Sequence, residues 1–115
     1  MKLYGIPNCS TVKKARTWLD ENKVAYEFHD FKKLGIDQVT LSEWLKQMSW
    51  EKLVNRAGMT WRGLSDAQKT AVQDNASAIA LMQDKTSVIK RPVLVDHGKI
   101  IGLGFDEASY QALLK

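Results

Sequence analysis

The first 22 residues place one thiol between a short strand and a helix, and no other stretch constrains the fold as strongly. An apolar run at residues 3–6, interrupted by Gly5 and ended by Pro7, predicts the strand. Residues 10–22 then carry apolar side chains at helical spacing. Cys9 therefore lies near the positive end of a helix dipole, where unpaired backbone N–H groups favour the thiolate. This position predicts a nucleophile.

The residues on either side of Cys9 indicate whether it is a reactive thiol or a residue that only fills the core. A cysteine that only fills a core normally lies within an apolar run, whereas the neighbours of Cys9 are typical of an exposed turn. These neighbours are Pro7, Asn8, Ser10 and Thr11. Three cations follow within about two helical turns, namely Lys13, Lys14 and Arg16. We expect a reactive thiol, with an inert packing role as the alternative.

Length, composition and charge narrow the class of protein. A chain of 115 residues, 44% of them hydrophobic, fits one domain with one core. Its single cysteine cannot form an internal disulfide, and residues 1–20 lack the apolar stretch of a signal peptide. No apolar run reaches the ~20 residues that span a bilayer. The net charge is +4, but the basic residues are spread along the chain and acidic residues are interleaved with them, which argues against nucleic acid as partner. We expect a cytoplasmic monomer.

The segment after the first helix predicts a second strand. Residues 24–31 alternate, with Tyr26 and Phe28 on one face and His29 on the other. A strand, a helix and a second strand of these lengths form a right-handed crossover with parallel strands. We expect His29 to be a surface residue rather than a catalytic one, and residues 32–38 to be a connection.

The middle of the chain is predicted to be helical. Thr40 and Glu43 predict a capping box for a helix from about residue 41 to 48, and Ser65 with Gln68 predicts a second box. Asn75 is expected to cap a helix that carries Ala78, Ile79 and Met82 on its inner face. Shorter helices are expected at residues 49–54 and 69–72.

Two apolar runs near the end of the chain, residues 89–95 and 99–103, flank a Gly-containing turn and predict a hairpin. Phe105 and Tyr110 are spaced as a hydrophobic staple for a helix at 107–114. The order βαβ, helices, ββα predicts an α/β domain of thioredoxin-like type over residues 1–115. It has a mixed four-stranded sheet and a helical insertion at about residues 40–84. We expect Trp44, Trp50 and Trp61 in that insertion to pack between helices.

Three stretches are specific enough to suggest relatives. They are Tyr4 to Lys14 with the run Lys14-Ala15-Arg16-Thr17-Trp18-Leu19, then Asn55-Arg56-Ala57-Gly58, and Lys90-Arg91-Pro92. On these stretches the chain resembles the arsenate reductase (ArsC) family, most closely its small YffB-like branch, which is related to the Spx regulators. The resemblance implies a nucleophilic cysteine, an oxyanion-binding arginine before a cis proline, and a second oxyanion-binding arginine. In this sequence they correspond to Cys9, Arg91, Pro92 and Arg62.

The implied roles suit the side chains. A guanidinium is a rigid fork of donors for an oxyanion or a carboxylate, and beside a thiolate it lowers the thiol pKa. The alternative for Arg62 and Arg91 is a salt bridge at the surface. Arsenate reductases of this type carry a third arginine after the second hairpin strand, and residues 102–105 have none, which counts against arsenate. Spx regulators usually carry a Cys-x-x-Cys pair, whereas this chain has Val12 three residues after Cys9.

With one cysteine, any disulfide must form with another molecule, and its release needs an external thiol. We therefore expect a thiol-dependent reductase without a bound cofactor, acting through a mixed disulfide on Cys9. Glutathione is the expected co-substrate, its carboxylates pairing with Arg91, Arg62 or Lys13, and a protein disulfide is a candidate substrate. The alternative is a non-enzymatic, Spx-like module that contacts a protein such as RNA polymerase. A nucleic-acid binder is a third hypothesis.

Overall fold

The computed structural model describes residues 1–114. Contacts within the chain divide it into two compact units. The first unit contains residues 1–34 and the chain from residue 91 onward, and the second unit contains residues 35–90. The second unit is thus an insertion in the first, with wider limits than the 40–84 expected from the sequence. No helix of the described part of the chain is long and apolar enough to cross a membrane.

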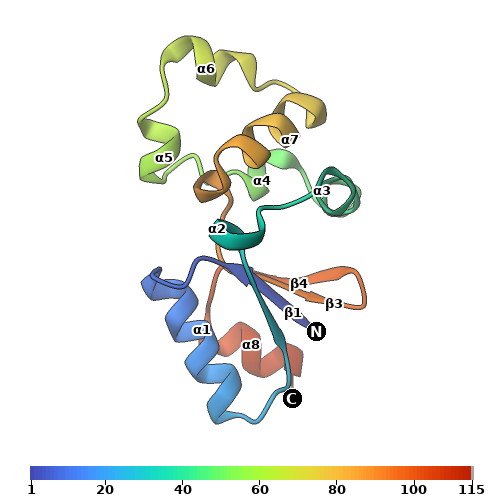
Figure 1. Cartoon of the computed structure of the whole chain (residues 1–115). Coiled ribbons are helices and arrows are strands. Elements are labelled where there is room, and N and C mark those ends of the chain that lie inside the picture. The colour runs from blue at the N-terminus through green and yellow to red at the C-terminus, as the bar shows by residue number, and fades with distance from the viewer. Residues whose placement is uncertain (115) are drawn as a thin grey trace. The chain divides into compact units, whose positions relative to one another are not determined.

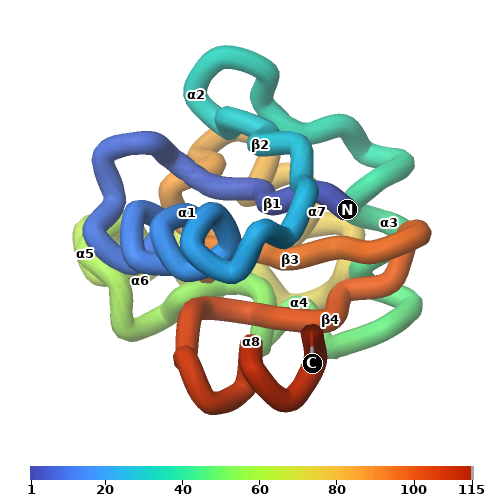
Figure 2. The backbone as a smooth tube through the Cα atoms, turned by 90° about the horizontal axis from the view of Figure 1, so that it is seen from below, coloured from blue at the N-terminus to red at the C-terminus, as the bar shows by residue number. Residues whose placement is uncertain are grey.

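The first unit is a four-stranded mixed sheet with helices, the predicted α/β fold of thioredoxin-like type. Its elements are β1 (Lys2–Gly5), α1 (Ser10–Glu21), β2 (Glu27–Asp30), α2 (Phe31–Leu34), β3 (Val93–Asp96), β4 (Lys99–Leu103) and α8 (Glu107–Leu114). The strand order is β2-β1-β3-β4, as Figure 2 shows. Strand β1 is parallel to β2 and antiparallel to β3, and β4 completes the predicted hairpin with β3. The strand that leads to Cys9 is therefore central.

The helices α1 and α8 cover the same face of this sheet (Figure 1). A buried core lies between them and the strands. It consists of Leu3, Ala15, Trp18, Leu19, Leu94 and Tyr110. The ring of Tyr110 meets Trp18 edge-on at 5.6 Å between centroids, and Phe105 edge-on at 4.8 Å, so the predicted staple at the start of α8 is present. The α1 stripe seen in the sequence is thus the face on which the thiol-bearing helix docks.

The second unit is helical apart from one isolated β-bridge. Its elements are α3 (Gln38–Leu45), α4 (Trp50–Leu53), α5 (Met59–Arg62), α6 (Asp66–Ala71), α7 (Asn75–Asp84) and the 3-10 turn η1 (Thr86–Val88). Helix α3 packs against α7, and of the predicted inner residues Ala78 and Met82 are fully buried, whereas Ile79 is only partly buried. Val54 pairs with Ile89 in the bridge, and the Lys90 amide donates to the Leu53 carbonyl at 2.7 Å.

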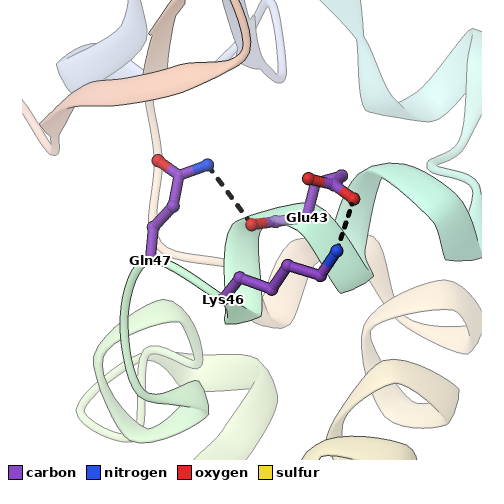
Figure 3. A network of polar contacts seen from close by, with 3 residues as sticks. All are labelled: Glu43, Lys46 and Gln47. Atoms are coloured by element: carbon purple, nitrogen blue, oxygen red, sulfur yellow. Dashed lines mark hydrogen bonds and ion pairs between the residues drawn. The ribbon is translucent and has the colours of Figure 1, made fainter.

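Two predicted caps of the second unit are wrong. Helix α3 begins three residues earlier than expected, because Asp37 is its N-cap and its carboxylate accepts from the Thr40 amide at 2.7 Å. The Glu43 carboxylate instead pairs with Lys46 at 3.0 Å, while the Glu43 carbonyl accepts from the Gln47 side chain at 3.2 Å (Figure 3). Likewise Asp74, and not Asn75, caps α7, in a box closed by Ser77. The predicted box of Ser65 and Gln68 is confirmed.

Two predicted strands are shorter than their apolar runs. In the run at residues 24–31 only β2 (Glu27–Asp30) is a strand, and it ends where the Asp30 carboxylate accepts from the Lys32 amide at 2.8 Å beside the start of α2. In the run at residues 89–95 the first apolar residue belongs to the second unit's bridge, and β3 begins only after Pro92. Helix α5 was not predicted individually within the helical block, since its N-cap, Gly58, has no side chain that could indicate where the helix begins.

Candidate thiol site

A turn after β1 fixes Cys9 at the start of α1. The Cys9 amide donates to the Ile6 carbonyl at 3.2 Å, and the Cys9 carbonyl accepts from the Lys13 amide at 2.9 Å. Its backbone is extended, with φ −91° and ψ 127°, as an N-cap requires. Pro7 and Asn8 are exposed as expected, and Cys9 is partly buried. The single thiol therefore stands at a helix N-terminus on the surface of the first unit, the position that the sequence predicts.

The surroundings of Cys9 lower its pKa. Partial burial, the largest single influence, raises the pKa of the thiol. The Val12 amide, the Arg91 side chain and the Thr11 amide lower it by hydrogen bonding to the thiolate, and the Arg91 charge adds to this, so the net shift is downward. The sulfur makes no capping hydrogen bond of standard geometry. The two amides and Arg91 are what offset the burial and favour the thiolate.

The chain returns from the second unit at Arg91, beside the thiol. The Arg91–Pro92 peptide bond is cis, as the resemblance implies. The Pro92 carbonyl accepts from the Gly104 amide at 2.8 Å, which joins this segment to the end of the hairpin. Val93 then pairs with Tyr4 of β1. Because β1 leads directly into the Cys9 turn, this register brings the half-buried Arg91 to the sulfur.

The other predicted site residues are placed differently. Lys13 is exposed on α1, one turn beyond Cys9. Arg62 is the exposed last residue of α5, in the second unit, and its role at the thiol stays a prediction. His29 lies against the ring of Tyr4, with 4.6 Å between centroids, and is partly exposed. The structure thus brings together Cys9 and Arg91.

Sequence reasoning missed a groove between α1 and the start of α8. It has a volume of about 400 Å³ and is lined by Lys13, Lys14, Thr17, Trp18, Glu21, Phe105 and Glu107. In the sequence, Trp18 belongs to the apolar spacing of the first helix and to the run that carries the family resemblance, and neither pattern indicates a groove. The polar row at Lys13, Thr17 and Glu21 could have been noticed, but its opposite wall comes from a distant segment.

The described residues contain no group of three or more histidine, cysteine, aspartate or glutamate side chains placed to hold a metal ion. At the thiol, the structure places Cys9 beside the Arg91 guanidinium and the amides of the first helical turn. This combination suits nucleophilic attack on sulfur or on an electrophilic oxyanion.

Comparison with known proteins defines the class. The family model described as ArsC family matches residues 4–113, so the chain belongs to the ArsC family. A solved structure of a YFFB protein is 52% identical, with a TM-score of 0.91, and the match covers 99% of this chain and 98% of that one. An arsenate reductase (ArsC) related protein from Brucella melitensis is 49% identical, with a TM-score of 0.77, over 96% of this chain and 91% of that one.

The curated relatives are of two kinds, an uncharacterized protein and transcriptional regulators. An uncharacterized protein of Haemophilus influenzae is 37% identical over 110 residues, 96% of this chain and 95% of the relative. A global transcriptional regulator Spx of Enterococcus faecalis is 23% identical over 99% of this chain and 86% of the regulator. The chain is therefore an arsenate reductase-related protein of thioredoxin-like fold with Spx-like relatives.

Proposed function

We propose that this protein is a glutathione-dependent thiol reductase in which Cys9 is the nucleophile and no cofactor is bound. The observation that carries the proposal is the position of the Cys9 sulfur at the N-terminus of α1, beside the helix amides and Arg91, where these donors lower the pKa of the thiol. A thiolate at neutral pH is the attacking species in thiol–disulfide exchange. Such a reductase needs a compartment that keeps glutathione reduced, which is the cytoplasm.

The proposed reaction has two exchanges. The Cys9 thiolate attacks the glutathione sulfur of a mixed disulfide, the S–S bond breaks, and the other thiol leaves with the electron pair and takes a proton from water. A glutathione thiolate then attacks the Cys9 adduct, which releases glutathione disulfide and regenerates Cys9. The substrate sulfur is reduced from a disulfide to a thiol, and the one incoming glutathione thiol is oxidised. The other sulfur of the glutathione disulfide was already at disulfide level in the mixed disulfide. A single cysteine suffices, in agreement with the absence of any other in the chain.

Arg91 has two proposed roles at this site. Its charge stabilises the thiolate before attack, and its guanidinium can pair with a carboxylate of glutathione once the adduct forms. Lys13, one turn along α1, is proposed as a second partner for these carboxylates. Arg62, the last residue of α5, is proposed as a further partner for the carboxylates of glutathione.

Mass spectrometry after exposure to glutathione disulfide tests the proposal. We expect one glutathione adduct on Cys9, its removal by reduced glutathione, and no adduct on Cys9→Ser. Turnover with arsenate is expected to be weak, because residues 102–105 contain no arginine. A Cys9 thiol that stays unmodified would contradict the reductase.

A second candidate, a Spx-like module that acts by contacting a protein such as RNA polymerase, is favoured by one observation. Spx regulators match 97–99% of this chain at 23–25% identity. Val12 stands where those regulators usually carry a second cysteine, so an internal disulfide switch does not transfer. Binding to purified RNA polymerase, together with an inert Cys9, would support this candidate over the reductase.

A further inference from the structure

The groove between α1 and the start of α8 continues a row that begins at the nucleophile. Lys13, Thr17 and Glu21 lie four positions apart on α1 and line the groove, and Cys9 is four positions before Lys13. Residues spaced by four share one face of a helix. Both helices cover the same face of the sheet (Figure 1). A substrate whose disulfide is attacked by the Cys9 sulfur can therefore extend along this face into the groove.

The length of the groove exceeds what glutathione can fill. The eight steps from Lys13 to Glu21 span about 12 Å of helix, and Lys13 is about 6 Å along the axis from Cys9, at about 1.5 Å per residue. An extended peptide advances about 3.3 Å per residue. The groove thus fits about four residues, beginning about two residues from the sulfur. Glutathione has only one residue on either side of its cysteine, so its far end reaches only the near end of the groove.

The walls of the groove differ in charge along its length. On the α1 wall, Lys13 and Lys14 supply ammonium groups toward the Cys9 end, and Glu21 supplies a carboxylate at the far end. On the α8 wall, Glu107 supplies a second carboxylate. Trp18, 6% exposed, and the half-buried Phe105 form an apolar part between α1 and α8. This arrangement is complementary to a peptide with an acidic side chain near its cysteine, then an apolar side chain, then a basic one.

We propose that the groove binds the polypeptide next to a substrate cysteine, so that the enzyme reduces mixed disulfides between proteins and glutathione. The proposal rests on the proposed function and names its substrate class. The Cys9 thiolate attacks the glutathione sulfur, the protein thiolate leaves and takes a proton from water, and a second glutathione releases glutathione disulfide from Cys9. The groove holds the protein segment while its sulfur departs.

Synthetic peptides with a cysteine linked to glutathione test the groove. One peptide carries Glu, Leu and Lys at the second, third and fifth positions from the cysteine, on both sides so that either chain direction is covered. The matched peptide exchanges Glu and Lys. We expect the wild-type protein to be glutathionylated about five- to tenfold faster by the first peptide. The double variant Lys13→Glu/Lys14→Glu should reverse the preference, and Glu21→Lys/Glu107→Lys should reduce or reverse it.

The matched control is Lys32→Glu/Lys33→Glu, which alters the adjacent exposed lysines of α2 in the same unit and should keep the wild-type preference. Circular dichroism verifies the fold of each variant. Equal rates with both peptides in the wild-type protein, alongside normal reaction with glutathione disulfide, would overturn the groove proposal and leave the reductase standing. Failure of Cys9 to react with glutathione disulfide as well would overturn the reductase itself.

Discussion

Gly5 lies directly against the side chain of Val12. A Cβ atom on residue 5 would stand 2.8 Å from Cγ2 and 3.2 Å from Cγ1 of Val12. Val12 is fully buried, and its amide is a donor to the Cys9 thiolate. The close approach of β1 to α1 therefore holds the first turn of the helix in the position that serves the sulfur.

The variant Gly5→Ala is expected to lower the free energy of unfolding by about 1–3 kcal/mol, because the added methyl overpacks the contact with Val12. It should also raise the Cys9 pKa, since the first turn of α1 must shift. Urea unfolding and the pH dependence of alkylation measure the two effects. Gly102→Ala is the control in the same sheet, where a Cβ would meet no atom nearer than 3.4 Å. Equal losses in the two variants would contradict the special role of Gly5.

Alkylation of Cys9 by iodoacetamide is expected to show a midpoint below the ordinary thiol pKa of about 8.5. A pKa lowered by folding stabilises the folded state above the unfolded-state pKa, and this stabilisation is lost as the pH falls through the folded-state value. The stability difference between wild type and Cys9→Ser should therefore grow as the pH rises toward about 8.5. A midpoint at or above 8.5 would remove the basis for a nucleophile.

Arg91→Ala is expected to slow the reaction of Cys9 with glutathione disulfide about ten- to a hundredfold, the range of a lost charge-assisted contact of about 1.5–3 kcal/mol. Arg91→Lys should recover only part of the rate, because it keeps the charge and loses the fork. Stopped-flow rates with a small neutral disulfide provide the comparison and should fall much less. Equal slowing with both disulfides would limit Arg91 to the thiol pKa, and an unchanged rate would exclude it from the site.

Tyr110→Phe is expected to leave stability at pH 7 unchanged or raised. The buried Tyr110 hydroxyl has no hydrogen-bond partner among residues 1–114, so its removal ends an uncompensated desolvation. Burial raises the pKa of Tyr110 to about 12, above the ordinary value of about 10. A raised pKa means that stability is full below pH 10 and falls as the pH rises toward 12.

Urea unfolding between pH 7 and 11 measures this effect. The stability of the wild type relative to the Phe variant should fall above pH 10, by at most about 1.4 kcal/mol per pH unit. A marked loss of stability in Tyr110→Phe at pH 7 would instead show that the hydroxyl is paired.

Local features of the fold could be predicted because they depend on neighbours in sequence. The turn at Cys9, the α1 stripe, the hairpin and the box of Ser65 and Gln68 each lie within a few residues. The N-cap residue was predicted wrongly where two candidate residues lie close together in the sequence. Asp37 was overlooked in favour of Thr40 because the capping-box pattern scores spacing, whereas the helix begins at the first residue able to accept its amides.

The candidate site could be predicted only in part, since half of it comes from a distant segment. Cys9 and its helix amides follow from local pattern, but the partnership with Arg91 came from the family resemblance alone. It depends on the pairing of β1 with β3, a register set by tertiary packing. Predicting the groove would require more than the strand register, because Phe105 reaches Trp18 only after α8 has docked on the sheet.

The second unit also separates the nucleophile from its arginine in time. A ribosome makes Cys9 near the beginning of the chain and Arg91 only after the whole insertion. Strand β3 cannot pair with β1 before then. The nascent thiol therefore lacks one of its activating partners until the insertion has been made, and its full reactivity arrives together with the strands that complete the sheet.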